Sequence, residues 1–516
     1  MTESSRPSVA TRVAIVVGSM LLAMSTPASA DDTHRYIVQF KHNEKFPNAA
    51  PLSELESAVP AGKIVKRNKR GKLLVAQLNE EEAQALRSRS EVESVEIDGV
   101  VSLSYTPNDT LLNDLTGFTG SVGIKALNAW DTSRGSDSAL IAVVDTGVDY
   151  NHPDLVDNIW TNPGEVPNNN VDDDGNGLVD DYRGYDFAGE DPDPMDKFGH
   201  GTHVAGTIAA TGDNGAGVVG VAWKSKIIPL KAMSDSGYGS YFDIIQAVDY
   251  AVKLKESGVP IAAINFSIAG TEFSGAWYRA IQRARDADIV VVAAAGNSSA
   301  NADRDPQYPA AFNLPNVISV AAIDSQGRLA SFSNFGRRTV DMAAPGVDIL
   351  STYPTDDLDG PYTYKSGTSM ASPQVAGIAA LVAAANPSIT KRQVRARILA
   401  TVSPLASLSR TTATGGTADA DAAVKTSLSV ARSLEVYGTV KNGSSTLAGV
   451  SIRARATDGS GVGGRTTSKS DGTFILAGLT PGTYVVTASK TGTRFRRRSY
   501  EVNLSKDSKL SFAVAR

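Results

Sequence analysis

The chain has 516 residues, of which 41% are hydrophobic and 20% are charged, and its net charge at pH 7 is −5. A charge this small on a chain of this length gives no argument for nucleic-acid binding. The chain has no cysteine, which excludes both a disulfide framework and a thiol nucleophile.

The first 30 residues have the pattern of a secretory signal. Arg6 and Arg12 precede an apolar run from Val13 to Met24, and Ala28-Ser29-Ala30 offers a small-x-small cleavage site. The apolar run is shorter than the about 20 residues that a membrane span needs. We therefore expect residues 1–30 to be a signal peptide and the protein to be secreted, with periplasmic transit in a cell that has two membranes. A short N-terminal anchor is the alternative.

Residues 31–105 predict a small α+β unit. The segments 36–40, 72–78 and 94–97 are rich in residues that favour strands. A helix is expected between the second and third segments, because Asn79 can cap it and three glutamates follow in its first turn. An independent binding domain is the alternative interpretation of this unit.

Residues 106–424 contain short apolar runs separated by helical patterns. The runs cover 140–144, 227–230, 261–266, 289–294 and 317–321. Such runs predict a parallel sheet that is buried on both faces and binds ligands at the carboxyl ends of its strands. Asp145, Ser267 and Asn297 each follow such a run, so we expect them to lie at a functional edge of the sheet.

Ser369 stands among small residues, Gly367 to Pro373, just before an apolar helical run. A serine at the N-terminus of a buried helix can attack a carbonyl group, while the free N–H groups of the helix hold the oxyanion. An ordinary serine cap before an alanine-rich helix is the alternative.

A nucleophilic serine needs a histidine base, and none of the five histidines follows Ser369. This excludes the Ser…Asp…His order of an α/β-hydrolase. Two upstream residues remain as partners: Asp145 ends an apolar strand, and His200 begins a small-residue helix. The chain therefore has the order Asp…His…Ser that occurs in subtilisin.

The stretches Asp145-Thr146-Gly147, His200–Gly206 and Gly367–Pro373 resemble those of the subtilase family of serine endopeptidases. A fourth stretch, Ala293–Asn297, agrees in its position after an apolar strand. The resemblance implies a subtilisin-like three-layer α/β domain with a central parallel sheet over residues 106–424. It also implies hydrolysis of peptide bonds in protein substrates.

The roles that the resemblance implies are specific. Ser369 is the expected nucleophile, His200 its base and Asp145 the group that orients the base, while the side chain of Asn297 donates to the oxyanion. The substrate is expected to pair with Asn265–Gly270 as an added strand. The expected substrate-binding residues are Ser267, Ile268 and Ala269 on that strand, with Ala295 and Gly296 as the facing wall. The family usually has glycine at the position of Ala269, so the subsites are expected to be narrower here.

The resemblance also implies that residues 31–105 form an inhibitor-like propeptide, which acts as an intramolecular inhibitor and is removed by the enzyme itself. Autocleavage is expected between Tyr105 and Thr106. A cut after Tyr105 implies a pocket that accepts large apolar or aromatic side chains before the cleaved bond. We expect the protein to be a monomer.

The connection between Asp145 and His200 contains an acidic stretch with the alternation of a calcium-binding loop. Arg183 stands where a glutamate would complete an EF-hand, so a different kind of calcium loop is expected. The predicted ligands are Asp172, Asp174, Asn176, Asp180 and Asp181. Bound calcium would order the loop and stiffen a domain without disulfides. A solvated acidic turn is the alternative.

Residues 425–433 predict a linker, and residues 434–516 predict a small β-sandwich. Short strands are expected at 436–440, 449–454, 472–476, 482–488 and 510–514. The region resembles a carboxypeptidase-regulatory or transthyretin-like domain, and nothing in it indicates catalysis. The arginines of Arg494–Arg498 favour a charged edge strand that resists aggregation over a polyanion-binding surface or a processing site.

An alternative function remains at this level. The protein would be a surface-attachment or substrate-binding protein led by the C-terminal sandwich, with the protease as an accessory. A degenerate, non-catalytic binding protein is disfavoured, because the expected triad and the oxyanion donor are all present.

Overall fold

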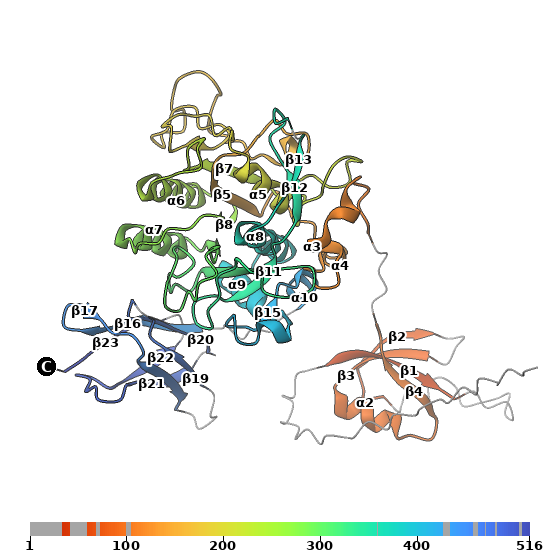
Figure 1. Cartoon of the computed structure of the whole chain (residues 1–516). Helices are drawn as coiled ribbons and strands as arrows, with labels where there is room; N and C mark the ends of the chain where they lie inside the picture. The colour runs from red at the N-terminus through yellow and green to blue at the C-terminus, as the bar shows by residue number, and fades with distance from the viewer. Residues whose placement is uncertain are drawn as a thin grey trace, which may run out of the picture. The chain divides into compact units, whose positions relative to one another are not determined.

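The computed structural model describes most of the chain in two compact units, Met1–Ser102 and Leu103–Arg516 (Figure 1). The described residues are 33–41, 59–68, 73–99, 105–358, 360–426, 434–457, 463–469, 471–479, 482–504 and 508–515. The predicted signal peptide, residues 1–30, and residues 427–433 of the predicted linker lie outside the described residues.

The first unit is a four-stranded antiparallel sheet with one helix. Its elements are β1 (His34–Phe40), β2 (Ile64–Asn68), β3 (Leu73–Leu78), α2 (Glu80–Arg87) and β4 (Val92–Ile97), and the strand order is β2-β3-β1-β4. Asn79 caps α2 and forms a capping box with Glu82. The expected strands and helix are present. The additional strand, β2, is exposed along most of its length and has no hydrophobic alternation, so periodicity does not predict it.

The second unit contains a nine-stranded sheet. Its strands are β5 (Leu140–Asp145), β6 (Tyr185–Asp186), β7 (Ile227–Lys231), β8 (Ile261–Phe266), β9 (Val290–Ala294), β10 (Val317–Ile323), β11 (Met342–Pro345), β14 (Ser403–Pro404) and β15 (Gly416–Thr417). The order is β14-β15-β11-β10-β9-β8-β5-β7-β6, and all neighbours are parallel except β14 and β15. The predicted apolar runs are the central strands of this sheet.

Helices cover both faces of the sheet (Figure 1). One layer contains α3 (Thr116–Thr119), α4 (Ala126–Ala129), α5 (His200–Ala209), α8 (Thr368–Ala385), α9 (Lys391–Ala400) and α10 (Ala420–Lys425). The other contains α6 (Tyr241–Glu256) and α7 (Gly275–Asp286). Within β5, Ile141 and Val143 pack on the first layer, and Ala142 and Val144 pack on the second. Alternation along one strand therefore builds a three-layer α/β domain.

The strand order reverses beside β5. From β5 the chain places β7 and β6 on one side, and β8, β9, β10 and β11 on the other. Ligands of open α/β sheets bind at such a switch point, outside the carboxyl ends of the strands. Asp145 is the last residue of β5 and is fully buried there. A hairpin of β12 (Ile349–Thr352) and β13 (Tyr362–Lys365) packs beside α5.

Helix α8 is long and apolar. By length and composition it could cross a membrane, but 83% of its apolar window is buried inside the protein, so it is a core helix. Pro373 lies within its second turn. Proline has no N–H, so the carbonyl of Ser369, four residues earlier, cannot receive its helical hydrogen bond.

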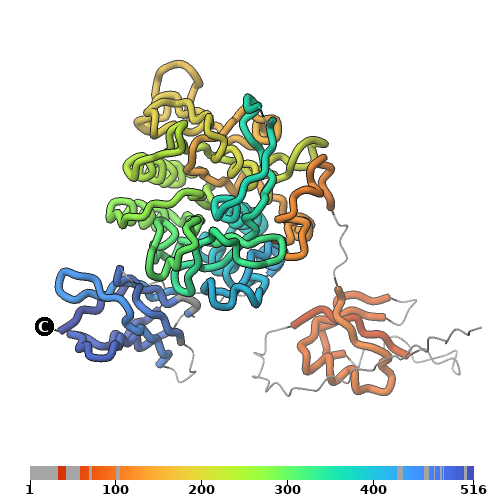
Figure 2. The backbone as a smooth tube through the Cα atoms, viewed as in Figure 1, coloured from red at the N-terminus to blue at the C-terminus, as the bar shows by residue number. Residues whose placement is uncertain are grey.

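Between residues 434 and 515, drawn in blue in Figure 2, the helices and strands of the described residues are all strands. The strands are β16 (Leu434–Asn442), β17 (Ser445–Thr446), β18 (Ser451–Ala456), β19 (Gly463–Thr467), β20 (Thr473–Leu479), β21 (Gly482–Ser489), β22 (Ser499–Leu504) and β23 (Ser508–Ala513). One sheet has the order β17-β16-β20 with β23 also on β16, and the other has the order β19-β18-β21-β22. Their inner faces share a core centred on Phe474 and Phe512. The arginines of Arg494–Arg498 lie in the segment before the edge strand β22.

Trp130 is a large buried side chain in the core of the α/β domain. Its side chain is 1% exposed, contacts Phe118 and Trp223 edge-on, and donates a 2.8 Å hydrogen bond to the carbonyl of Val221. We expect Trp130→Ala to lower the free energy of unfolding by about 3–5 kcal/mol, because it leaves a cavity and an unpaired carbonyl. Urea unfolding followed by circular dichroism measures the change.

Phe242→Ala is the matched control, because that side chain is 65% exposed. We expect its effect to stay within about 0.5 kcal/mol. Equal losses in the two variants would contradict the packing described for Trp130.

Candidate active site

The carboxylate of Asp145 and the imidazole of His200 form the shortest link in the site. Nδ1 of His200 donates to Oδ1 of Asp145 over 2.6 Å, because a carboxylate can only accept. Oδ1 also accepts from the backbone N–H of Thr146. Asp145 is 0% exposed and His200 is 21% exposed, so the pair lies at the edge of solvent with Nε2 of the ring left to accept a proton.

A second acid, Asp196, joins the two elements that carry this pair. It accepts from the hydroxyl of Thr146, beside Asp145, and from the N–H and hydroxyl of Thr202, two residues after His200. The carboxylate is buried, and its hydrogen bonds offset the cost of burying the charge. Asp196 therefore fixes the end of β5 against the start of α5.

Charges around the imidazole set its proton affinity. Burial lowers the pKa of His200, but the charge and hydrogen bond of Asp145, helped by the charge of Asp196, outweigh burial and raise that pKa above its ordinary value. Lys365 on β13 opposes this rise. His203, one turn further along α5, is neutral near pH 7, because burial lowers its pKa to about 3.

Ser369 and Ser267 are joined by two hydrogen bonds in opposite directions. The hydroxyl of Ser369 donates to the carbonyl of Ser267, and the hydroxyl of Ser267 donates to the carbonyl of Ser369, both over 2.8 Å. The second bond satisfies the carbonyl that Pro373 leaves without a helical donor. The end of β8 is thus fastened to the start of α8.

Asn297 is held against the start of α8 by two hydrogen bonds. Oδ1 of Asn297 accepts from the N–H and the hydroxyl of Thr368, each over 2.9 Å, which fixes the orientation of the amide. A Cβ atom placed on Gly367 would lie 3.5 Å from Nδ2 of Asn297 and 3.6 Å from the backbone N of Ser369. The two nitrogen atoms therefore lie close to the same point beside Gly367.

An open cleft of about 400 Å³ lies beside Asp145 and His200. Its lining includes Asp145, His200, Ser267, Ile268 and Ala269. The remaining lining is largely apolar and aromatic, from Phe198, Met233, Tyr238, Tyr241, Ile244 and Trp277. The structure thus brings three of the predicted substrate-binding residues to the same cleft as the acid and the base.

Ala295 and Gly296 follow β9 and are both buried. Gly296 has a φ of +102°, and a Cβ there would meet Oε1 of Gln307 at 1.8 Å, so only glycine fits this position. The N–H of Gly296 donates to the hydroxyl of Thr368, which places the Ala295–Gly296 segment beside the start of α8.

Tyr105 lies on a different part of the second unit. Its ring stacks on Trp223 at 6.0 Å between centroids, and the guanidinium of Arg134 lies 3.8 Å from its ring centre. Its hydroxyl donates to Asp213. None of these partners lines the cleft, and the structure does not bring Tyr105 to Ser369 or His200. Thr106 follows it as an exposed residue.

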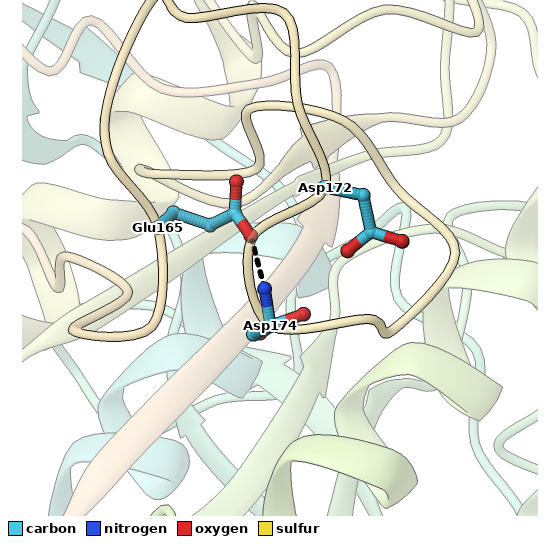
Figure 3. Close-up of side chains that lie close together, drawn as sticks. All are labelled: Glu165, Asp172 and Asp174. Carbon is cyan, nitrogen blue, oxygen red and sulfur yellow. Dashed lines mark hydrogen bonds between the residues drawn. The ribbon is translucent and has the colours of Figure 1, made fainter.

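Glu165, Asp172 and Asp174 form an acidic cluster on the long connection between β5 and α5 (Figure 3). One oxygen from each carboxylate lies within 4.8 Å of the others. Oε1 of Glu165 accepts from the N–H of Asp174, while Oε2 is buried and has no hydrogen-bond partner among the described residues. Three close carboxylates with an unpaired buried oxygen have the donor set that Ca²⁺ prefers.

The other predicted calcium ligands lie around this cluster. Asn176 donates its side-chain N–H groups to Asp174 and Asp181. Asp181 also accepts from the hydroxyl of Tyr250, whereas Asp180 accepts from the backbone N–H groups of Asn169 and Asn170. Asp180 therefore stabilises the loop backbone, and Asp181 joins the loop to α6.

Sequence reasoning missed two acids at these sites. Asp196 has only the weak signal of an acid four residues before His200. Glu165 lies seven residues before Asp172, outside the alternation that indicated a calcium loop. Both contributions depend on how a long loop folds back, which residue spacing does not encode.

Asp196 gives a test of the electrostatics at His200. We expect Asp196→Asn to lower the pKa of the His200 ring, because a negative charge that favours the imidazolium is removed. NMR titration of the ring in the folded protein measures this pKa. Asp193→Asn changes an exposed acid on the same loop and should leave the midpoint where it is. An unchanged midpoint in the Asp196→Asn variant would contradict an electrostatic effect of Asp196 on the pKa of His200.

Comparison with known proteins agrees with the family predicted from the motifs. The Subtilase family matches residues 136–439, and the Carboxypeptidase regulatory-like domain matches residues 435–515. The chain is 39% identical over 351 residues to the thermophilic serine proteinase of Bacillus sp. (strain AK1), which covers 67% of this chain and 77% of that protein. It is 37% identical over 350 residues to the extracellular protease of Xanthomonas campestris pv. campestris, with coverage of 64% and 59%.

Among solved structures, a protease of Pseudoalteromonas arctica is similar, with 33% identity and a TM-score of 0.51, over 62% of this chain and 99% of that chain. The parallel sheet with helical layers and the C-terminal strands confirm the predicted fold class. The chain therefore belongs to the subtilase family and is a subtilisin-like serine endopeptidase with a C-terminal carboxypeptidase regulatory-like domain.

Proposed function

We propose that the protein is a secreted endopeptidase that cleaves proteins through Asp145, His200 and Ser369. The observation that carries the proposal is the 2.6 Å bond between His200 and Asp145, which opens onto the cleft that also contains Ser267, the partner of Ser369. Secretion is supported by the pattern of residues 1–30 and by the Xanthomonas campestris relative, which is named an extracellular protease.

In the proposed mechanism the hydroxyl of Ser369 turns from the carbonyl of Ser267 to Nε2 of His200. His200 takes the proton as Oγ attacks the scissile carbonyl, and later delivers it to the leaving amine. Asp145 holds the tautomer of the ring and stabilises the imidazolium. Asn297 and the N–H of Ser369 donate to the oxyanion. Since the pKa of His200 is raised, the acid limb of kcat/KM should lie above the ordinary histidine value.

The peptide substrate is proposed to add as a strand along Ser267, Ile268 and Ala269, with Ala295 and Gly296 on the facing side. The apolar and aromatic cleft lining supports a preference for large apolar or aromatic side chains before the cleaved bond. The side chain of Ala269 is exposed and narrows the space that a glycine would leave.

Residues 31–105 are proposed to be a propeptide that inhibits the enzyme until the enzyme removes it between Tyr105 and Thr106. The independent compact core of the first unit supports a separate folding role. Because Tyr105 packs against Trp223 and Arg134, a cut after it requires the ring to leave that position. The mature enzyme is proposed to act as a monomer.

Ser369→Ala tests the nucleophile and the processing together. We expect the variant to accumulate as an unprocessed precursor and to lose roughly 10⁴- to 10⁶-fold in kcat on a peptide substrate. Mass spectrometry and N-terminal sequencing of both secreted proteins measure the processing. Ser366→Ala, an exposed serine three residues away, is the control and should be processed normally.

Catalytic amounts of wild-type enzyme added to the Ser369→Ala precursor separate self-cleavage from cleavage by another protease. A mature chain that starts at Thr106 would fit the proposed boundary, whereas a start at Tyr105 or earlier would move it. Full processing and full activity of Ser369→Ala would contradict the proposed nucleophile.

We also propose that Glu165, Asp172 and Asp174, with Asn176 and Asp181 nearby, hold a structural Ca²⁺. The buried unpaired oxygen of Glu165 and the mutual repulsion of three close carboxylates support this. Bound calcium would supply charge neutralisation and oxygen coordination to the loop. The loop lies between β5 and α5, so its order bears on the positions of Asp145 and His200.

Calcium removal should lower the thermal stability of the folded protein. At a calcium concentration 100 times the Kd, binding contributes about 2.7 kcal/mol, which corresponds to a Tm change of roughly 4 °C for a domain of about 320 residues. Differential scanning calorimetry of Ser369→Ala with calcium and with excess chelator measures the shift without autolysis. Asp172→Asn should be insensitive to the chelator, whereas Glu190→Gln, an exposed loop variant, should respond like the parent. An identical Tm with and without chelator would contradict the site.

A further inference from the structure

The charges of the chain are distributed unevenly along its length. Residues 434–516 contain thirteen Lys and Arg against five Asp and Glu, a net charge of +8, whereas residues 106–433 contain 24 against 37, a net charge of −13. The small overall charge of −5 conceals this division.

Three arginines gather on the outer face of the sheet β19-β18-β21-β22. Along β18, Ile452 and Ala454 are buried, so Arg453 and Arg455 point to solvent. Arg453 lies directly opposite Arg465 of β19 in the strand register. Like charges in directly opposed positions destabilise a sheet, and among the described residues none of the three arginines forms an ion pair with a carboxylate.

Protection of a sheet edge does not account for this arrangement. Charged residues guard edges when they lie on the outermost strands, here β19 and β22. Arg453 and Arg455 lie on β18, which pairs on both sides. Folding alone therefore gives no reason for the opposed arginines, and an anion bound between them would remove their repulsion.

A basic groove borders this face. Its volume is about 1090 Å³, and its cationic lining residues are Arg465, Lys490, Arg494 and Arg498. Nε of Arg465 donates to the hydroxyl of Ser451 over 2.9 Å, and Nζ of Lys490 donates to the carbonyl of Ala448 over 2.6 Å. These bonds hold two of the four cations in place at the groove.

The remaining lining indicates the kind of anion. Hydroxyl groups of Ser451, Ser489, Thr491 and Thr493 stand among the cations and can bond to sugar hydroxyls. Guanidinium groups match carboxylate and sulfate in bidentate geometry. Phe495 is the one aromatic residue among the described residues that line the groove, and it is buried, so these residues offer no ring on which a nucleobase could stack.

We propose that the basic groove and the adjoining arginines bind an acidic polysaccharide, with carboxylate or sulfate groups on the arginines. The groove is large and open enough for several sugar units. The acidic remainder of the chain would be repelled by such a polymer, so the sandwich supplies the attachment. This site goes beyond the proposed peptidase mechanism and does not depend on it, because binding can be measured with the inactive chain.

The test uses the full chain with Ser369→Ala and two probes, polygalacturonate for carboxylate and dextran sulfate for sulfate. Neutral dextran and duplex DNA serve as comparison ligands, and biolayer interferometry gives each Kd at low and high salt. We expect the chain to bind at least one acidic polysaccharide. Combining Arg465→Gln, Arg494→Gln and Arg498→Gln should weaken this binding about tenfold or more. Binding should also fall with added salt.

A matched variant with Arg279→Gln, Arg304→Gln and Arg410→Gln removes the same charge from exposed positions outside the sandwich and should bind as the parent does. Arg465→Gln alone should leave the Tm unchanged or raise it, because a like-charge contact is relieved. Cleavage of a short peptide by the groove variant, with Ser369 intact, should equal wild type. The proposal is overturned by equal losses in both triple variants, by no binding to either acidic polymer, or by tighter binding of duplex DNA.

Discussion

The rest of the structure depends on a buried carboxylate that is held against an imidazole at the edge of solvent. Asp145 has no exposed surface, so its charge is tolerable only because Thr146 and His200 donate to it. The contact requires α5 to approach the end of β5 very closely, and Gly201 permits this. A Cβ atom there would come within 2.1 Å of the carbonyl of Gly147. Asp196 then binds both elements and removes the remaining freedom between them.

Much of this could be predicted from the sequence, because the relevant signals are local or strongly patterned. The capping box at Asn79 and the apolar runs of the central strands follow from a few neighbouring residues. The apolar patterns beside them place Asp145 at the end of a strand and His200 and Ser369 at the starts of helices. The roles of Glu165 and Asp196 could not be predicted, because the fold of a long loop brings them to their sites. Tyr105, at the predicted autocleavage site, packs against Trp223 and Arg134, and these contacts depend on residues far from it in the sequence.

The C-terminal region is basic, although the net charge of the whole chain is small. The small net charge gives no argument for nucleic-acid binding, but it conceals that the acidic and basic residues belong to different parts of the chain. The spacing of the arginines before β22 predicts edge protection, and β22 is an outer strand. The strand register adds Arg453 on an inner strand opposite Arg465, and such register cannot be read from spacing alone.

The paired hydroxyls of Ser267 and Ser369 have a consequence for engineering. Ser267 lines the cleft, so it is an obvious position for changing which peptides fit. The same side chain closes the gap that Pro373 leaves at the beginning of a core helix. A substitution that removes the hydroxyl of Ser267 would leave the buried carbonyl of Ser369 without this donor and would weaken the start of α8. At Ser267, substrate selectivity and thermal stability are therefore coupled through one hydroxyl group.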